Sequence, residues 1–313
     1  MWRQTIFKNV FVIFTISFFI SGSAWSKHQW NQLAVLTASD KELGDAFGES
    51  VSISGDYTIL GAEFDDDKGE NSGSAYIFKR QGKDWIEQCK LAASDSNSFD
   101  FFGHCVSISG NYAIVGTYGG AAAYIFKRDG ETWFEQCKLD VNEPIDWRFG
   151  TRVSISERHA IVSNYGRHRG PGCAYIFERE AETWNLQCKL AEPADDYGRS
   201  VAICNNFAIV GARSNLGTAF IYRLSENVWE LQCELTGNES GFGRSFDICQ
   251  NYAIFGSSEA AYIYKREGDT WNMQEKLIAS DGTAYDGFGG SVSISGNLAI
   301  VAASNDDDNG EYS

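Results

Sequence analysis

The sequence predicts an all-β fold, a β-propeller made of four-stranded antiparallel blades. A similar unit recurs every 42 to 55 residues along the 313-residue chain, and a period of this size indicates one supersecondary unit that has been copied. Each unit holds four apolar or alternating segments of strand length, and the 3.6-residue periodicity typical of helices is missing. Four such strands cannot bury both faces alone, so we expect the copies to pack around an axis.

Two residue types recur at a fixed place in every unit, and their positions indicate the number of blades. A glycine after an aromatic residue opens each unit, and a tryptophan opens the last strand. The glycines are Gly48, Gly103, Gly150, Gly198, Gly243 and Gly289. The tryptophans are Trp30, Trp85, Trp133, Trp184, Trp229 and Trp271. We therefore expect about six blades, five of them complete and one split between the two ends of the chain.

Residues 1–26 have the layout of a secretory signal peptide. Arg3 and Lys8 precede an apolar run at 10–20, and the small-residue stretch SGSAWS follows. The run has 11 residues, whereas a membrane-spanning helix needs about 20, so an N-terminal anchor is the weaker alternative. We expect a propeller domain at 27–313 that is secreted, periplasmic or on the cell surface, with no membrane span in the mature chain.

The first two strands of a unit are predicted to form a tight hairpin. In the first copy, SVSIS at 50–54 alternates apolar and polar residues, and YTILGA at 57–62 is apolar on both faces. Gly55-Asp56 lies between them, and glycine or asparagine recurs there in other copies. Residues that tolerate positive φ predict a two-residue turn at this place.

The third strand, SAYIF at 74–78, is predicted to meet the fourth, WIEQCKL at 85–91, across a turn at Gln81-Gly82. This register sets Phe78 opposite Trp85 and predicts one such aromatic pair in every blade. A glycan-stacking surface is the alternative role for the tryptophans. Because they recur in every unit, we favour core packing.

These repeats resemble a known family. Phe-Gly occurs at positions 47, 102, 149, 242 and 288, Tyr197-Gly198 is a variant, and Gly-Ala follows at 61 and 211. The pattern resembles the FG-GAP repeat proteins, which include the head propeller of integrin alpha subunits. The resemblance implies a seven-bladed propeller, extracellular ligand binding, and calcium held in the hairpin between the first two strands of some blades.

The calcium expectation is modified by the residues of this chain. A Ca²⁺ ion needs about 6–8 oxygen ligands, which the short hairpin at 54–57 cannot supply, so we expect the usual family sites to be absent. Acidic clusters follow one connection later instead. Their candidate metal ligands are Asp65, Asp67, Asp306 and Asp308. A solvated acidic loop is the favoured alternative, so the prediction is no cofactor, with calcium as a possibility.

A basic stretch stands out in a chain whose formal net charge is −16. Its candidate ligand-binding residues are Arg158, Arg167, His168 and Arg169. They could receive an anionic ligand such as a sulfated or uronic glycan, although a solvated loop is the favoured alternative. The acidity of the whole chain argues against nucleic acid as a partner.

The chain has eight cysteines, which in an exported protein can form disulfides. The predicted hairpin register places Cys173 opposite Cys188, at a separation that a disulfide can bridge, so we predict that bond. For the other cysteines we expect small buried thiols.

The split blade lacks a strand. The chain opens with what resembles a fourth strand at Trp30 and closes after the first two strands, at 291–303, so no third strand is supplied. Three alternatives remain open: a blade of three strands, a truncated copy of a longer propeller, or a strand donated by a partner or within an oligomer.

We expect a noncatalytic binding module, with a protein or glycan held by loops on one propeller face. The alternative is an extracellular glycan-active enzyme with a carboxylate site at the central channel. Its candidate residues would be Asp95, Asp146, Asp195 and Asp196. No nucleophile motif, phosphate loop or HExxH zinc motif is present, which leaves the noncatalytic role preferred.

Overall fold

The computed structural model describes residues 16–17, 34–145, 148–165, 172–212, 216–279, 286–296 and 298–303. All the regular structure in these ranges is β-strand, in antiparallel sheets numbered here in chain order. Sheet 1 has β2 (Val51–Ser54), β3 (Tyr57–Ala62), β4 (Ser74–Gln81) and β5 (Asp84–Leu91). Sheet 2 has β6 (Cys105–Ser109), β7 (Tyr112–Gly116), β8 (Ala123–Asp129) and β9 (Thr132–Lys138). Sheet 3 has β10 (Val153–Ile155), β11 (His159–Asn164), β12 (Cys173–Glu180) and β13 (Thr183–Leu190).

The remaining sheets follow the same plan. Sheet 4 has β14 (Ser200–Cys204), β15 (Phe207–Ala212), β16 (Thr218–Ser225) and β17 (Val228–Thr236). Sheet 5 has β18 (Ser245–Cys249), β19 (Tyr252–Gly256), β20 (Ala261–Glu267) and β21 (Thr270–Leu277). Sheet 6 has three strands, in the order β1 (Ile16–Ser17), β23 (Leu298–Ala303) and β22 (Phe288–Ser295).

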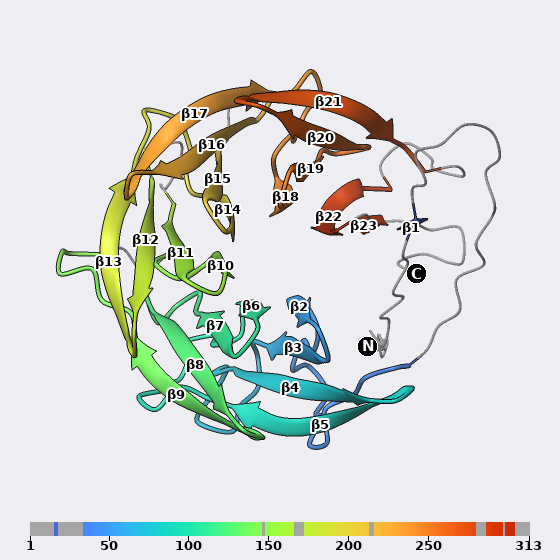
Figure 1. Cartoon of the computed structure of the whole chain (residues 1–313). Coiled ribbons are helices and arrows are strands. Elements are labelled where there is room, and N and C mark those ends of the chain that lie inside the picture. Colours follow the sequence, from blue (N-terminus) through green and yellow to red (C-terminus); the bar gives the residue numbers. More distant parts are fainter. Residues whose placement is uncertain are drawn as a thin grey trace, which may run out of the picture.

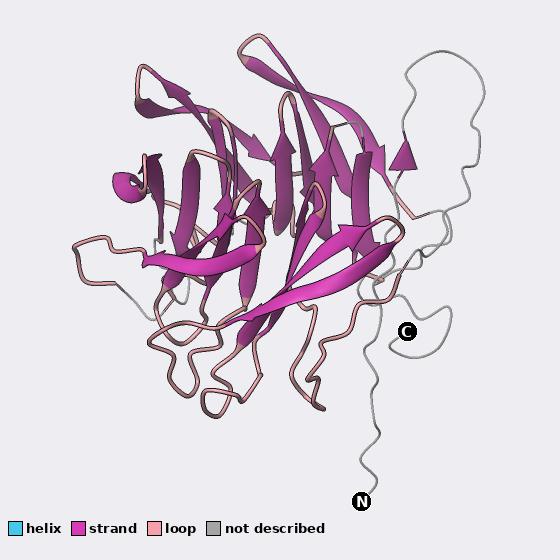
Figure 2. Cartoon of the chain, turned by 60° about the horizontal axis from the view of Figure 1, so that its bottom comes forward, coloured by secondary structure: helices cyan, strands magenta, loops and turns pink. Residues whose placement is uncertain are grey.

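The sheets stand side by side around a common axis in chain order. Figure 1 shows that in sheets 1 to 5 the first strand lies nearest the axis and the fourth strand lies at the outside, and that in sheet 6 β22 lies nearest the axis. Figure 2 shows the connections gathered at the two ends of this ring of strands. None of the described residues forms a helix long and apolar enough to span a membrane.

The inner hairpins have the predicted register. Ser54 pairs with Tyr57 across the turn Gly55-Asp56, and Gly55 has a φ of +59°, as a tight turn requires. The Asp56 carboxylate accepts hydrogen bonds from the guanidinium of Arg80, at 2.8 and 2.6 Å. The prediction from the turn residues is therefore confirmed in sheet 1.

The predicted register of the outer hairpins is wrong. The turn residues of sheet 1 are Gly82-Lys83, because Gln81 pairs with Asp84, and a bulge shifts the ladder once more between Ile77 and Phe78. Trp85 therefore lies opposite Arg80. The same bulge recurs in sheets 2 to 5.

This register also removes the basis for the predicted disulfide. Cys188 lies opposite Ile176, because the turn is Ala181-Glu182 and a bulge falls between Ile176 and Phe177. Both Cys173 and Cys188 are free thiols, as are the other six cysteines. The predicted bond between Cys173 and Cys188 is thus absent.

The tryptophans of the fourth strands join neighbouring sheets. Trp184 packs edge to face on Tyr112 of sheet 2, with ring centroids 5.7 Å apart, and its Nε1 donates to Oε1 of Gln136 at 3.2 Å. Trp229 and Trp271 likewise donate to a glutamine of the preceding sheet. Of the described tryptophans, Trp133, Trp184, Trp229 and Trp271 are buried in the core as predicted, and Trp85 is partly buried. The hydrogen-bond acceptors of Trp184, Trp229 and Trp271 lie in the preceding sheet.

The two glycine motifs contact each other across the same junction. A Cβ on Gly61 of sheet 1 would lie 1.9 Å from the carbonyl oxygen of Gly103, at the start of sheet 2. Gly103 itself has a φ of +92°, and a Cβ there would lie 2.2 Å from the carbonyl oxygen of Ser74. Both positions therefore need glycine, because two backbones approach where a side chain would stand.

The apolar core fills the layers between sheets. One cluster joins Ile59 of sheet 1 to Val106 and Phe126 of sheet 2, and similar clusters join each later pair of sheets. Serines of the inner strands add polar links, since Oγ of Ser50 accepts the Val106 N–H at 2.9 Å. A single sheet is therefore stabilised mainly by its neighbours.

Candidate functional site

Three connections pack together at one end of sheets 1 and 2. They run from β3 to β4, from β5 to β6, and from β7 to β8. Phe101 N–H donates to the Asn71 carbonyl at 3.1 Å, and Gly119 N–H donates to the Asp100 carbonyl at 3.2 Å. These backbone bonds hold loops from different units in one surface, which we name the loop face.

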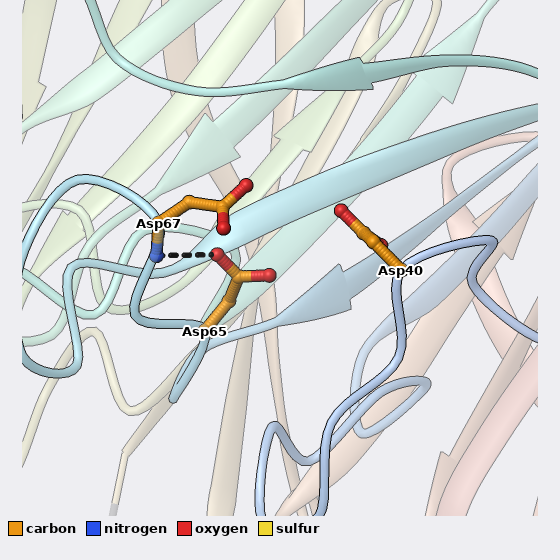
Figure 3. A group of neighbouring side chains, drawn as sticks. All are labelled: Asp40, Asp65 and Asp67. Carbon is orange, nitrogen blue, oxygen red and sulfur yellow. Dashed lines mark hydrogen bonds between the residues drawn. The ribbon is translucent and has the colours of Figure 1, made fainter.

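An acidic cluster lies on this face. One carboxylate oxygen from each of Asp40, Asp65 and Asp67 can be chosen so that all lie within 4.8 Å of one another, and Figure 3 shows the three side chains converging. Lys90 already supplies a cation, because its Nζ lies 2.8 Å from Asp40, 2.7 Å from Asp65 and also contacts Asp67. Tyr76 donates its hydroxyl to Asp40 and Asp65.

The charges of this cluster stabilise one another. Burial raises the pKa of the Asp65 carboxyl, but hydrogen bonds led by that of Lys90 outweigh burial, and the net pKa is lowered. Burial lowers the pKa of Lys90, and hydrogen bonds led by that of Asp40 outweigh it, so the net pKa is raised. The cluster therefore holds a charged lysine among carboxylates at neutral pH.

A simpler form of this arrangement recurs around the ring. In sheet 2, Asp95 accepts from Tyr124 at 2.7 Å and from Lys138 at 2.7 Å, and Lys138 lies over the Tyr124 ring. Sheets 3 and 5 repeat it with a glutamate, a tyrosine and a lysine. Only sheet 1 adds the two extra carboxylates Asp65 and Asp67, since the corresponding connections of the other described sheets contribute none to such a group.

Beside this cluster lies a group of four aromatic side chains, the aromatic cluster. Phe101 contacts Phe64, Phe99 and Tyr118, with centroid separations of 5.7, 6.3 and 6.1 Å. Phe99 is 49% exposed and Tyr118 is 37% exposed. Phe99 and Phe101 have φ values of +67° and +53°, which are rare for bulky residues and store strain.

A polar chain borders the aromatic cluster. His104 Nδ1 contacts the Glu63 carboxylate, and the Arg152 guanidinium lies 2.8 Å from His104 Nε2. Since a guanidinium can only donate, Nε2 accepts and Nδ1–H donates to Glu63, which makes the imidazole neutral in this arrangement. Tyr118 packs on the His104 ring at 5.1 Å. Three sheets thus contribute to one continuous polar and aromatic surface.

The predicted site residues fall into two groups. Asp65 and Asp67 belong to the acidic cluster, together with Asp40, which sequence reasoning missed. Arg158 lies before β11 and pairs with Glu178, so it stands at the other end of that strand from the segment that follows Asn164. Five predicted residues lie outside the described ranges, namely Asp306, Asp308, Arg167, His168 and Arg169.

The carboxylates considered for an enzyme do not form a second group. Asp95 is bonded to Tyr124 and Lys138, Asp196 lies 3.9 Å from Arg199, and Asp146 lies outside the described ranges. Within the described residues, Asp40, Asp65 and Asp67 are the set of three found close enough to share an ion.

Comparison with known proteins agrees with the repeat pattern. The family model described as FG-GAP repeat matches residues 30–78, 85–126 and 271–313. These three regions match the FG-GAP repeat. A crystal structure titled as that of a functionally unknown protein from Desulfotomaculum acetoxidans DSM 771 superposes with a TM-score of 0.52, at 11% sequence identity, over 74% of this chain and 70% of that one. That likeness concerns the fold alone, and no functionally curated protein matches the sequence.

The family match explains why the motif glycines recur in register. Gly61 belongs to the Gly-Ala half of one repeat and Gly103 to the Phe-Gly half of the next. The two glycines meet at the sheet junction described above. The aromatic cluster has no counterpart in that repeat pattern. Three phenylalanines within four positions, at 99, 101 and 102, were the one local sequence feature that pointed to the aromatic cluster.

Proposed function

We propose that this FG-GAP repeat chain is a β-propeller of six blades and serves as a noncatalytic binding module outside the cell. The ring of sheets in Figure 1 and the core between neighbouring sheets support the propeller. The signal-like segment at 1–26 and the repeat family support export. Its ligand is a protein or a glycan, bound on the loop face.

The exposed aromatic cluster is the observation that carries this proposal. Phe99 and Phe101 adopt a backbone conformation that costs about 1–3 kcal/mol at each residue, and the packed loops enforce it. Exposed aromatic rings beside an arginine are typical of binding surfaces, because they offer large apolar area with few rotatable bonds. The alternative that each Phe simply fills the core does not fit Phe99, which is 49% exposed.

The polar groups favour binding over catalysis. His104 Nε2, the atom that would act as a general base, already accepts from Arg152, and Lys90 already neutralises the acidic cluster. A guanidinium, a neutral imidazole and a carboxylate in one row can instead donate to and accept from the hydroxyls of a sugar or the backbone of a peptide. We infer that Lys90, and no calcium ion, balances the acidic cluster.

The test is binding by the full chain and by matched variants. The probes are an array of neutral, sulfated and uronic-acid oligosaccharides and an array of cell-surface proteins. Phe99→Asn and Phe101→Asn remove the rings while keeping a residue that tolerates positive φ. Phe134→Asn is the control, since Phe134 is exposed on the outer strand β9.

We expect a ligand found on either array to lose at least about tenfold in affinity with the first two variants, which is about 1.4 kcal/mol. Phe134→Asn should bind as the unchanged chain does. Equal binding by all four proteins would place the ligand elsewhere and contradict the role of the loop face. Turnover of an oligosaccharide on the array would contradict the noncatalytic assignment.

A further inference from the structure

The second strand of sheet 6, β23, differs from its counterparts in what lies on its outer edge. In sheets 1 to 5, the second strand is paired on both sides, with the first and the third strand. In sheet 6, β23 pairs with β22 along most of its length, and on the other side only Ala299 and Leu298 are paired, with Ile16 and Ser17 of β1. Within the described residues, the edge from Ile300 to Ala303 has no strand beside it.

Most described side chains of β23 are more exposed than those of the second strand in sheet 1. In sheet 1, Ile59 and Leu60 occupy the positions that correspond to Ile300 and Val301, and they are 0% and 1% exposed. Ile300 and Val301 are instead only partly buried. The apolar residues of β23 are thus of the type that a third strand covers elsewhere in this molecule.

The backbone of β23 offers donors in a defined register. In sheet 1, Gly61 N–H donates to Ser50 of β2, so the alternate Leu60 N–H faces β4. Since Ala302 of β23 pairs with Ser291 as Gly61 does with Ser50, the Val301 and Ala299 N–H groups face outward. An unpaired strand edge of this kind is a template for another strand.

The five complete sheets indicate which strand fits. In sheet 1, the third strand β4 has a small residue, a tyrosine, an isoleucine and an aromatic residue in succession. Leu60 of β3 lies opposite the tyrosine, Tyr76, and Ile59 lies opposite the isoleucine, Ile77. In the same register, Val301 would lie opposite the tyrosine and Ile300 opposite the isoleucine. β1 takes the place of the last part of such a strand and shows that the edge accepts antiparallel pairing.

We propose that the outer edge of β23 is a strand-addition site, whose occupant is an extended segment with the pattern of the repeat's own third strand. This interaction surface is separate from the loop face and does not depend on the ligand proposed there. Backbone hydrogen bonds would supply affinity, and the covering of Ile300 and Val301 would supply specificity for alternating apolar side chains.

The probe is a peptide with the sequence of residues 73–81, GSAYIFKRQ, added to the full chain. Arg80 N–H donates to Asp56 at the edge of β3, so in the same alternation the Phe78 and Tyr76 N–H groups face the second strand. A peptide N-methylated at Tyr76 therefore loses a donor to β23. A peptide N-methylated at Ile77 is the matched control, because that N–H faces away.

We expect saturable binding, with new protection of the amides at 299–303 against hydrogen exchange. N-methylation at Tyr76 should weaken binding at least about tenfold, and N-methylation at Ile77 should weaken it much less. The mature chain 27–313 lacks β1 and its pairing with Ala299 and Leu298, so it should bind the unmodified peptide more strongly than the full chain does.

The proposal is overturned if the unmodified peptide does not bind, if both methylated peptides bind equally, or if protection appears away from β23. Self-association of the chain that protects the same amides without peptide would assign the edge to a second copy, and would overturn the occupant proposed here.

Discussion

The ammonium nitrogen of Lys90 lies 2.7 Å from the carboxylate of Asp65, at the point where three aspartates converge. The Asp65 side chain is only 6% exposed. Because the lysine comes from the fourth strand and the aspartate from the connection after the second, this ion pair ties the loop face to the outer edge of sheet 1.

Lys90→Met should destabilise the protein by about 3 kcal/mol, since it leaves a buried carboxylate without its cation. Lys68→Met is the matched control, because Lys68 is exposed in the same loop and has no ion pair among the described residues. Urea unfolding at pH 7 measures both. A change below about 0.5 kcal/mol for Lys90→Met would show that the cluster is solvated.

In the Lys90→Met variant the three carboxylates would be open to calcium. Added calcium should therefore raise the melting temperature of the variant and leave that of the unchanged chain unaffected.

The same substitution should alter stability in acid. The pKa of Asp65 is below the ordinary value of 3.8, so its contribution is present above about pH 4 and is lost as pH falls through the lower folded pKa. Lys90→Met has already lost most of this contribution. Its free energy of unfolding should therefore fall less between pH 5 and pH 3 than that of the unchanged chain.

His159→Phe should stabilise the protein below neutral pH. Burial lowers the pKa of His159 below 6.5, which outweighs the nearby Glu178, and its buried Nε2 has no hydrogen-bond partner among the described residues. Stability from this neutral imidazole is therefore present above pH 6.5 and declines as pH falls below it, because the unfolded chain takes up the proton more readily. Sheets 1, 2, 4 and 5 have tyrosine or phenylalanine at this position. We expect a gain of about 1 kcal/mol at pH 5 and a smaller change at pH 8, from melting curves at both pH values. An equal gain at both would show that packing alone is responsible.

Gly103→Ala should be far more costly than an ordinary glycine substitution. Its Cβ would meet the Ser74 carbonyl oxygen at 2.2 Å, which is fixed backbone, so we expect a loss above about 3 kcal/mol. Gly82→Ala is the control, because Gly82 also has positive φ but nothing within 4 Å of a new Cβ, and should lose about 1 kcal/mol. Similar losses for both would mean that conformation, and not the close approach of sheets 1 and 2, explains the motif.

Trp184→Phe should cost about 1 kcal/mol, because it removes the donor to Gln136 but keeps an aromatic ring on Tyr112. Trp184→Ala should cost about 4 kcal/mol. Trp85→Phe is the control, since no glutamine acceptor for Trp85 is found among the described residues. Chemical denaturation reports the three values, and equal losses for the two phenylalanine variants would remove the intersheet hydrogen bond as a source of stability.

All eight cysteines should be recovered as thiols. Burial raises the pKa of Cys89, Cys137 and Cys188 to about 11, so few thiolates exist at pH 8. Alkylation should be slow in the folded protein and complete after unfolding, with an intact mass that does not change on reduction. A bridge between Cys173 and Cys188 would contradict the observed register of sheet 3.

Local signals were enough to predict the order of strands and the inner hairpins, because a glycine between two apolar runs defines a short turn within a few residues. They were not enough for the outer hairpins. Gly82 fits either place of a two-residue turn, and the bulge after Ile77 has no signature in the sequence. Each error shifts every later pair, which is why the Cys173 prediction failed while the strands themselves were placed correctly.

The site depended on contacts that no local pattern contains. Asp65 and Asp67 stood out as a charged run, but Asp40 reaches them from the segment before β2 and Lys90 from β5. Phe101 and Tyr118 likewise come from different connections, and the backbone bond from Gly119 to Asp100 holds the two connections together. Sequence periodicity finds what every unit shares, whereas this surface is built from what single units add.

The junction of Gly61 with Gly103 has a consequence for how such a chain can change during evolution. The bare backbone of one unit fits the bare backbone of the next, so whole units can be duplicated or lost and the remaining neighbours still fit. Gain or loss of half a unit would instead leave strands without a partner. Recombination within this gene should therefore be tolerated best at spacings of one full repeat.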